Sequence, residues 1–147
     1  METRAIIDRK SVFLVIILVV LAAAVNSQTL FQFPFIQDVE GTNLSNAWAV
    51  STTGELSPYT YTYEEPPAGS FLLAAWARLT GGFAAFGFSI HSGRAFMLIC
   101  HLASLAFVYG ITRKLTKSDS AAIIAALIFV FSPLTIGYQR RVLLENL

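Results

Sequence analysis

The sequence predicts an all-α membrane protein, a polytopic helical bundle with three transmembrane helices and a long outer-face loop that carries short interfacial helices. Two observations are compositional: 55% of the 147 residues are hydrophobic and only 13% are charged. Soluble domains carry roughly 25% charged residues, and a small body keeps much of its chain at the surface. The third observation is that the charges leave three long stretches free, as in a chain that crosses a bilayer.

The charge balance and the cysteine content exclude several other classes of protein. Ten Lys and Arg residues stand against nine Asp and Glu residues, which gives a formal net charge of +1. This balance excludes a strongly basic nucleic-acid binder, so the expected partners are membrane lipids and not nucleic acid. Cys100 is the single cysteine, which excludes an internal disulfide and a cysteine-built metal site.

Each of the three uncharged stretches is long enough to cross a bilayer, which takes roughly 20 helical residues. They cover residues 11–30, 95–112 and 120–139. A charged side chain at mid-depth is costly, whereas a helix satisfies its own backbone polar groups. The basic segment 113–119 joins the second stretch to the third and predicts a tight turn between antiparallel spans.

The distribution of Lys and Arg predicts the orientation. Three of these residues, Arg4, Arg9 and Lys10, precede the first span. Three more, Arg113, Lys114 and Lys117, lie in the short segment that joins the second span to the third. Short loops rich in Lys and Arg face the cytoplasm. We therefore expect a cytoplasmic N-terminus, the 31–93 loop on the outer face, and a plasma membrane or equivalent location. Cleavage of the first apolar segment as a signal peptide is an alternative that leaves the later topology unchanged.

The 31–93 loop is expected to hold local structure, because it is dense in aromatic residues. A short helix is predicted to begin at Asp38, which is able to cap its first turn, and to end before Gly54. Residues 58–63 alternate strictly between tyrosine and other residues, which predicts an extended segment.

A second short helix is predicted over residues 67–79. Pro67 suits the first position of a helix, because the first amides have no partner there, and Gly81 follows its end. Its apolar residues recur at helical spacing. The helix is therefore expected to lie either in the membrane interface or against neighbouring spans.

An ordered series of elements runs through the chain. It comprises an acidic pair outside the first span, a helix, a tyrosine-rich stretch, a proline pair and basic residues at the ends of later spans. The residues are Asp38, Glu40, Gly54, Pro58, Pro66, Pro67, Arg94, Ser132, Pro133 and 138–146. Together they resemble the C-type membrane glycosyltransferases, whose relatives include the protein O-mannosyltransferases and the lipid A aminoarabinose transferase.

The resemblance implies an activity and a place within a larger protein. The activity is transfer of a sugar from a polyprenyl-phosphate-linked donor to an acceptor hydroxyl or lipid on the outer membrane face. Members of the family have more spans than the three predicted here. Residues 1–147 are therefore expected to be the N-terminal part of a multi-pass glycosyltransferase domain.

The resemblance also implies three acidic candidates for catalysis. Asp38 is the candidate base that takes the proton of the acceptor hydroxyl; alternatively it only caps the following helix. Glu40 orients the acceptor, shares the base role or joins Asp38 in holding a divalent cation, the one possible cofactor; alternatively it is a solvated first-turn acid. Glu145 resembles a second acidic position of the family, or pairs with Arg141 across one helical turn. Val39 separates Asp38 from Glu40, whereas the acidic pair of the family is often adjacent.

Five further residues are predicted to contact the substrate. The adjacent guanidinium groups of Arg140 and Arg141 suit a lipid phosphate through paired hydrogen bonds, and ordinary headgroup binding is the alternative. The same two interpretations apply to Arg94. Tyr61 and Tyr63 either stack on the sugar or its carrier, or pack at the interface.

One residue inside a predicted span is ionisable. His101 lies in the middle of the second span, where such a residue is a functional candidate; the alternative is a neutral hydrogen-bond partner between helices. The sequence contains no phosphate loop, nucleophile elbow, zinc motif or dinucleotide fingerprint. The alternative function is that of a non-enzymatic multi-pass membrane subunit, a transporter or assembly component whose outer acids bind a cation or a partner.

Overall fold

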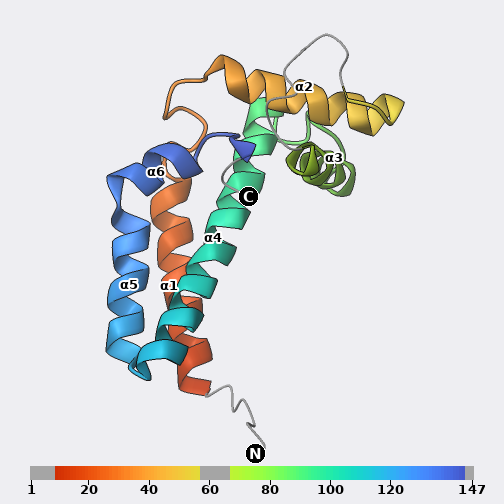
Figure 1. The fold of residues 1–147 in the computed structure, drawn as a ribbon. Helices are drawn as coiled ribbons and strands as arrows, with labels where there is room; N and C mark the ends of the chain where they lie inside the picture. The colour runs from red at the N-terminus through yellow and green to blue at the C-terminus, as the bar shows by residue number, and fades with distance from the viewer. Residues whose placement is uncertain (1–8, 57–66, 145–147) are drawn as a thin grey trace, which may run out of the picture.

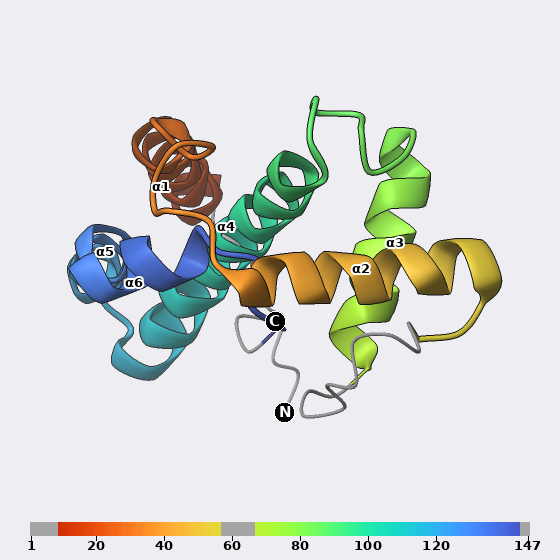
Figure 2. The same ribbon diagram turned by 90° about the horizontal axis from the view of Figure 1, so that it is seen from above.

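The computed structural model describes residues 9–56 and 67–144, which form six α-helices and no β-strand. The helices are α1 (Arg9–Ser27), α2 (Asp38–Thr53), α3 (Ala68–Thr80), α4 (Ser89–Thr116), α5 (Asp119–Phe131) and α6 (Pro133–Gln139). Helices α1, α4 and α5 stand side by side as a bundle, and α2 and α3 lie across one end of it (Figure 1; Figure 2). The all-α prediction is confirmed for the described residues, whereas the extended segment 58–63 lies outside them.

Three alanines and four larger apolar residues form the buried contacts between the bundle helices. The buried cluster consists of Leu18, Ala22, Leu105, Tyr109, Ala122, Ala126 and Val130. Small side chains let helix backbones approach closely, which is typical of helix contacts in membranes. Large apolar side chains such as Ile16, Phe107 and Ile128 point outward and are more than half exposed. A helix that is apolar on all sides is expected in lipid or in a protein core.

Two helices, α1 and α4, are long and apolar enough to cross a membrane, and α5 with α6 adds a third candidate if this bent pair is one span. The pair bends by 59° at Ser132, whose backbone is extended. Pro133 explains the break, because proline lacks an amide hydrogen and disfavours a helical residue before it. The predicted span 120–139 therefore corresponds to two helices, α5 and α6, that meet at a bend.

The turn between α4 and α5 is shorter than predicted, because α4 continues to Thr116 and α5 begins at Asp119. An ionic cluster joins three helices at this end of the bundle. The Asp119 carboxylate accepts from Arg113 Nε at 2.6 Å, and its other oxygen lies 3.6 Å from Lys10 Nζ. The side chains are partly exposed, so we expect each pair to contribute little to stability.

Helices α2 and α3, which we call the transverse layer, pack on the first turns of α4. The cluster between them contains Leu44, Ala47, Val50, Leu73, Ala74, Met97 and Val142. Both short helices predicted in the 31–93 loop are thereby confirmed. Each ends at a glycine with positive φ, Gly54 at +80° and Gly81 at +94°, as is common where a helix stops.

The first turn of α2 is capped by a different residue from the one predicted. Gln37 is the N-cap, and its backbone N–H donates to the Glu40 Oε1 at 3.3 Å. Asp38 is the first helical residue and is exposed. The interpretation of Asp38 as the cap is therefore wrong, because an N-cap residue must lie outside the helix.

Gly93→Ala is expected to destabilise the fold by about 1–3 kcal/mol, which is typical of overpacking in a core. A Cβ at Gly93 would lie 2.7 Å from Val142 Cγ2 and 3.1 Å from Leu44 Cδ2. Both neighbours belong to the buried cluster of the transverse layer, so neither moves freely. Unfolding in detergent, followed by circular dichroism, measures the change.

Gly110→Ala is the matched control, because Gly110 lies in the same helix and an added Cβ meets nothing within 4 Å. This variant is expected to be as stable as the wild type or slightly more so, since alanine favours helix more than glycine does. Equal stabilities of the two variants would contradict the close approach at Gly93.

Candidate functional site

A buried ion pair joins the transverse layer to the bundle. Arg94, on α4, donates from Nε to Glu40 Oε2 at 3.0 Å and from Nη2 to Glu40 Oε1 at 2.9 Å. Both side chains are completely buried. This paired geometry is the strong form of a guanidinium–carboxylate contact. The alternatives of a solvated Glu40 and a headgroup-bound Arg94 are therefore wrong.

Backbone groups supply the remaining hydrogen-bond partners of Arg94 and Glu40. Arg94 also donates to the carbonyl oxygens of Leu30 and Pro34, at 3.0 and 2.9 Å. Glu40 Oε2 accepts from the Val142 N–H at 3.1 Å. The pair thus connects α2, α4, the segment after α1 and the segment after α6. A buried charge needs this degree of compensation, because removing it from water is costly.

The same contacts bring the segment after α6 to the beginning of α2. Asn43 Nδ2 donates to the Val142 carbonyl at 3.0 Å, and Arg141 Nη1 donates to Gln37 Oε1 at 3.2 Å. Gln37 is the neighbour of Asp38 in the chain. The Arg141 side chain is therefore bonded to the residue that precedes the exposed Asp38 in the chain.

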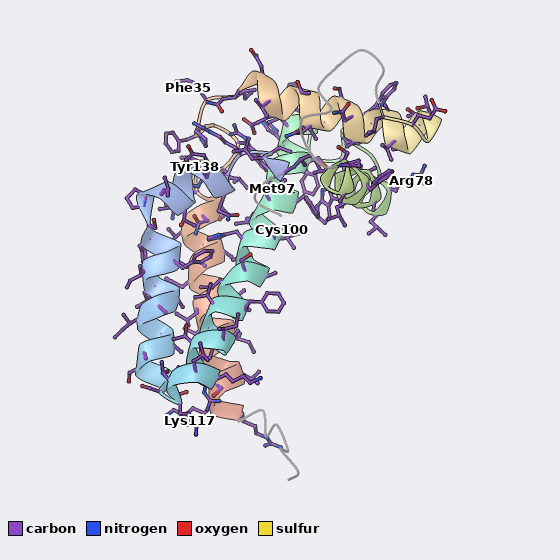
Figure 3. All side chains as sticks on the ribbon, viewed as in Figure 1. Phe35, Arg78, Met97, Cys100, Lys117 and Tyr138 are labelled. Atoms are coloured by element: carbon purple, nitrogen blue, oxygen red, sulfur yellow. The ribbon has the colours of Figure 1, made fainter. Side chains whose placement is uncertain are left out.

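Arg140 and Arg141 take different directions. Arg140 is buried and donates from Nη2 to the Val25 carbonyl of α1 at 3.3 Å, and burial lowers its pKa. The Arg141 guanidinium lies 5.9 Å from the centre of the Tyr138 ring. Figure 3 places Tyr138 at the end of the bundle that carries the transverse layer and Lys117 at the opposite end. Although Arg140 and Arg141 are adjacent in the sequence, their guanidinium groups therefore have different contacts and do not form a symmetric pair.

The predicted cation site does not fit the geometry of the acidic pair. Both Glu40 oxygens accept hydrogen bonds from the protein, so Asp38 is the one exposed carboxylate of the two. Among residues 9–56 and 67–144, no three His, Cys, Asp or Glu side chains are grouped to hold a metal ion. Three predicted site residues lie outside the described residues: Tyr61, Tyr63 and Glu145. The predicted pairing of Glu145 with Arg141 is therefore not described either.

His101 is buried between α4 and α5. Its ring stacks on Phe129 with centroids 5.0 Å apart, and neither ring nitrogen has a hydrogen-bond partner. The interpretation of His101 as a hydrogen-bond partner between helices is therefore wrong, since the contact is aromatic stacking.

Sequence reasoning missed the structural roles of Gln37, Asn43 and Val142. Gln37 and Asn43 are ordinary polar residues of the loop and helix, and Val142 contributes through its backbone N–H and C=O. The sequence offered one signal for a contact between these two segments, the acidic residues near position 38 and the basic residues near position 140. Nothing in their spacing indicates that these segments meet.

Comparison with known families identifies the group to which this arrangement belongs. The family model described as dolichyl-phosphate-mannose-protein mannosyltransferase matches residues 64–146, more than half of the chain. The chain belongs to this family. No curated protein and no solved structure matches the chain. The predicted resemblance to membrane glycosyltransferases of the protein O-mannosyltransferase group is confirmed.

The match to the mannosyltransferase family covers α3 to α6, and with them Arg94, Arg140 and Arg141. Asp38 and Glu40 precede the matched range, yet Glu40 is bonded to Arg94 and to Val142 within it. The apolar helices and the family together indicate an integral membrane glycosyltransferase.

Proposed function

We propose that the protein transfers a sugar from a polyprenyl-phosphate-linked donor to an acceptor hydroxyl or lipid at the outer membrane face. Membership of the mannosyltransferase family supports the sugar-transfer chemistry. The observation that carries the proposal is the hydrogen bond between Arg141 and Gln37, which holds a guanidinium group on the N-cap residue of α2, next in the sequence to the exposed Asp38. Transfer from a lipid phosphate needs both a base and a positive charge.

Asp38 is proposed to take the proton of the acceptor. Its carboxylate is exposed at the first position of α2, where an acceptor is able to reach it. The first turn of a helix favours a negatively charged group, and Asp38 occupies the first position of this turn. A side chain within hydrogen-bond reach of the acceptor hydroxyl contributes general-base catalysis.

Arg141 is proposed to contact the phosphate that leaves with the lipid carrier. Guanidinium groups bind phosphate through two parallel hydrogen bonds. Arg140 adds a second positive charge one residue away while its own guanidinium is directed to α1. Tyr61 and Tyr63 are proposed as further substrate contacts. Glu145 is proposed as a second acidic group.

Glu40 and Arg94 are proposed as positioning residues. Both are completely buried, which supports a role in holding other groups and not in contacting substrate directly. Through the Val142 N–H, Glu40 holds the segment that carries Arg141 against the turn that carries Asp38. The distance between the base and the phosphate-binding group therefore depends on this pair.

Arg141→Gln is expected to weaken binding of polyprenyl phosphate by about 10- to 100-fold, because hydrogen bonds to charged groups contribute about 1.5–3 kcal/mol. Titration of the purified intact protein in detergent with polyprenyl phosphate measures this affinity. Polyprenyl phosphate is the part of the donor that remains after transfer, so the test needs no acceptor.

Arg78→Gln is the matched control for Arg141→Gln. Arg78 is an exposed arginine on α3 that donates to the Ser51 carbonyl at 2.7 Å. Its replacement is expected to leave polyprenyl phosphate binding unchanged. An equal loss in both variants, or no loss in Arg141→Gln, would remove Arg141 from the proposed phosphate site.

A further inference from the structure

Exposed apolar side chains run along α5 and continue onto α6. The opposite side of α5 packs into the bundle through Ala122, Ala126 and Val130. Within each helix, successive exposed residues are three or four positions apart, the spacing of neighbours on one helix face. We call this exposed set the apolar path, and it consists of Ile124, Ile128, Phe131, Leu134 and Tyr138.

Core packing does not account for the position of α6, because none of its residues is buried. The 59° bend turns α6 away from the direction of α5. In Figure 1, α6 lies at the end of the bundle that carries the transverse layer, and Figure 2 shows it directed from α5 toward the beginning of α2. The apolar path therefore leaves the side of the bundle and crosses its end.

The apolar path ends at Arg141. The guanidinium carbon of Arg141 lies 5.9 Å from the centre of the Tyr138 ring. The same guanidinium donates to Gln37 Oε1, at the beginning of α2. The ring of Tyr138 is therefore both the last member of the path and a neighbour of the group that is proposed to bind phosphate.

The other end of the apolar path lies in the third candidate span. Ile124 and Ile128 are more than half exposed on α5, and exposed apolar residues of a span contact lipid chains. The sequence contains no charged residue between Asp119 and Arg140. The path therefore joins the hydrocarbon region to a cationic side chain without a charged interruption.

We propose that the isoprenoid chain of the polyprenyl-phosphate donor lies along the apolar path, with its phosphate at Arg141. This inference rests on the proposed function. A polyprenyl phosphate joins an anionic group to a long apolar chain, so its binding surface has to match both parts. Guanidinium groups bind phosphate, and an apolar chain that leaves the bilayer is stabilised where it contacts apolar side chains.

Shortening the path and shortening the ligand separately test this placement. The combined change Phe131→Ala and Leu134→Ala removes two large side chains from the path and leaves Tyr138 and Arg141 in place. Both positions are exposed, so the variant is expected to fold. Undecaprenyl phosphate and isopentenyl phosphate, which keeps the phosphate but has a single isoprene unit, are titrated into the purified intact protein in detergent.

The combined variant is expected to bind undecaprenyl phosphate several-fold more weakly than the wild type does, and to bind isopentenyl phosphate equally well. Phe107→Ala is the matched control, because Phe107 lies on α4 and, like Leu134, is 70% exposed. Both affinities are expected to be unchanged in this control. An equal loss of undecaprenyl phosphate binding in the control would overturn the proposal.

Two other outcomes would also overturn the proposal. Unchanged binding of undecaprenyl phosphate would mean that bulk lipid or another protein segment covers the path. An equal loss of both ligands would mean that the substitutions act on the phosphate site.

Arg141→Gln distinguishes failure of the apolar path from failure of the proposed function. This variant is expected to bind both ligands more weakly, since both carry the phosphate. Wild-type binding of both ligands by Arg141→Gln would count against the proposed phosphate site. A loss in Arg141→Gln with no loss in the combined variant would overturn the apolar path alone.

Discussion

Asp38→Asn is expected to lower sugar transfer from a polyprenyl-phosphate-linked donor by about 10²- to 10⁴-fold, the usual contribution of a general base. The amide keeps the size of the side chain but accepts a proton far less readily. Asp38 is exposed, so the variant is expected to fold and insert normally. Turnover of polyprenyl-phosphate mannose by the intact protein measures the loss.

Glu55→Gln is the matched control for Asp38→Asn. Glu55 is an exposed acid just beyond the C-terminal end of α2, and its replacement removes the same charge from the same layer. We expect transfer to be unchanged in this variant, and polyprenyl phosphate binding to be retained in both. Wild-type turnover in Asp38→Asn would exclude Asp38 as the base and leave the proposed phosphate site to be judged by Arg141→Gln.

Glu40→Gln is expected to destabilise the fold by about 3–5 kcal/mol, because it leaves the guanidinium of Arg94 buried without an opposite charge. The substitution also weakens the acceptor for the Val142 N–H. The segment after α6 is then expected to separate from α2. Unfolding in detergent measures the stability, and protease sensitivity of the chain after α6 measures the separation.

Two variants separate the ion pair from a general effect of charge. Asp119→Asn removes a partly exposed acid from the other end of the bundle and is expected to change stability far less than Glu40→Gln does. Combining Glu40→Gln with Arg94→Met removes both charges and is expected to be less destabilising than the sum of the single changes. Strict additivity would contradict a direct pair.

Local patterns predicted most of the helices. The uncharged stretches located α1, α4 and α5, and the break at Pro133 follows from the chemistry of proline, although it was not expected from the hydropathy of 120–139. The two short helices of the transverse layer were predicted from their stop signals at Gly54 and Gly81. These features depend on residues close together in the chain, so local physical rules are enough to predict them from the sequence.

The site was predicted only in part. The acidic residues near position 38 and the basic residues near positions 94 and 140 were selected, and the structure brings Glu40, Arg94 and the backbone of Val142 into direct contact. Their individual burial was not predicted: Glu40 and Arg94 are interior, whereas Asp38 is exposed. Sequence spacing does not distinguish these cases, because residues two positions apart on a helix face different surroundings.

By itself the sequence determined the membrane class, the helix positions and the residue types available for chemistry, since these depend on composition and on short-range periodicity. The tertiary structure decided that the Asp38 carboxylate is exposed and that the Glu40 carboxylate is buried and paired with Arg94. It also decided that Arg141 approaches Gln37 and that α3 lies beside Ser92. Each of these contacts joins segments far apart in the chain, and packing in three dimensions brings them together.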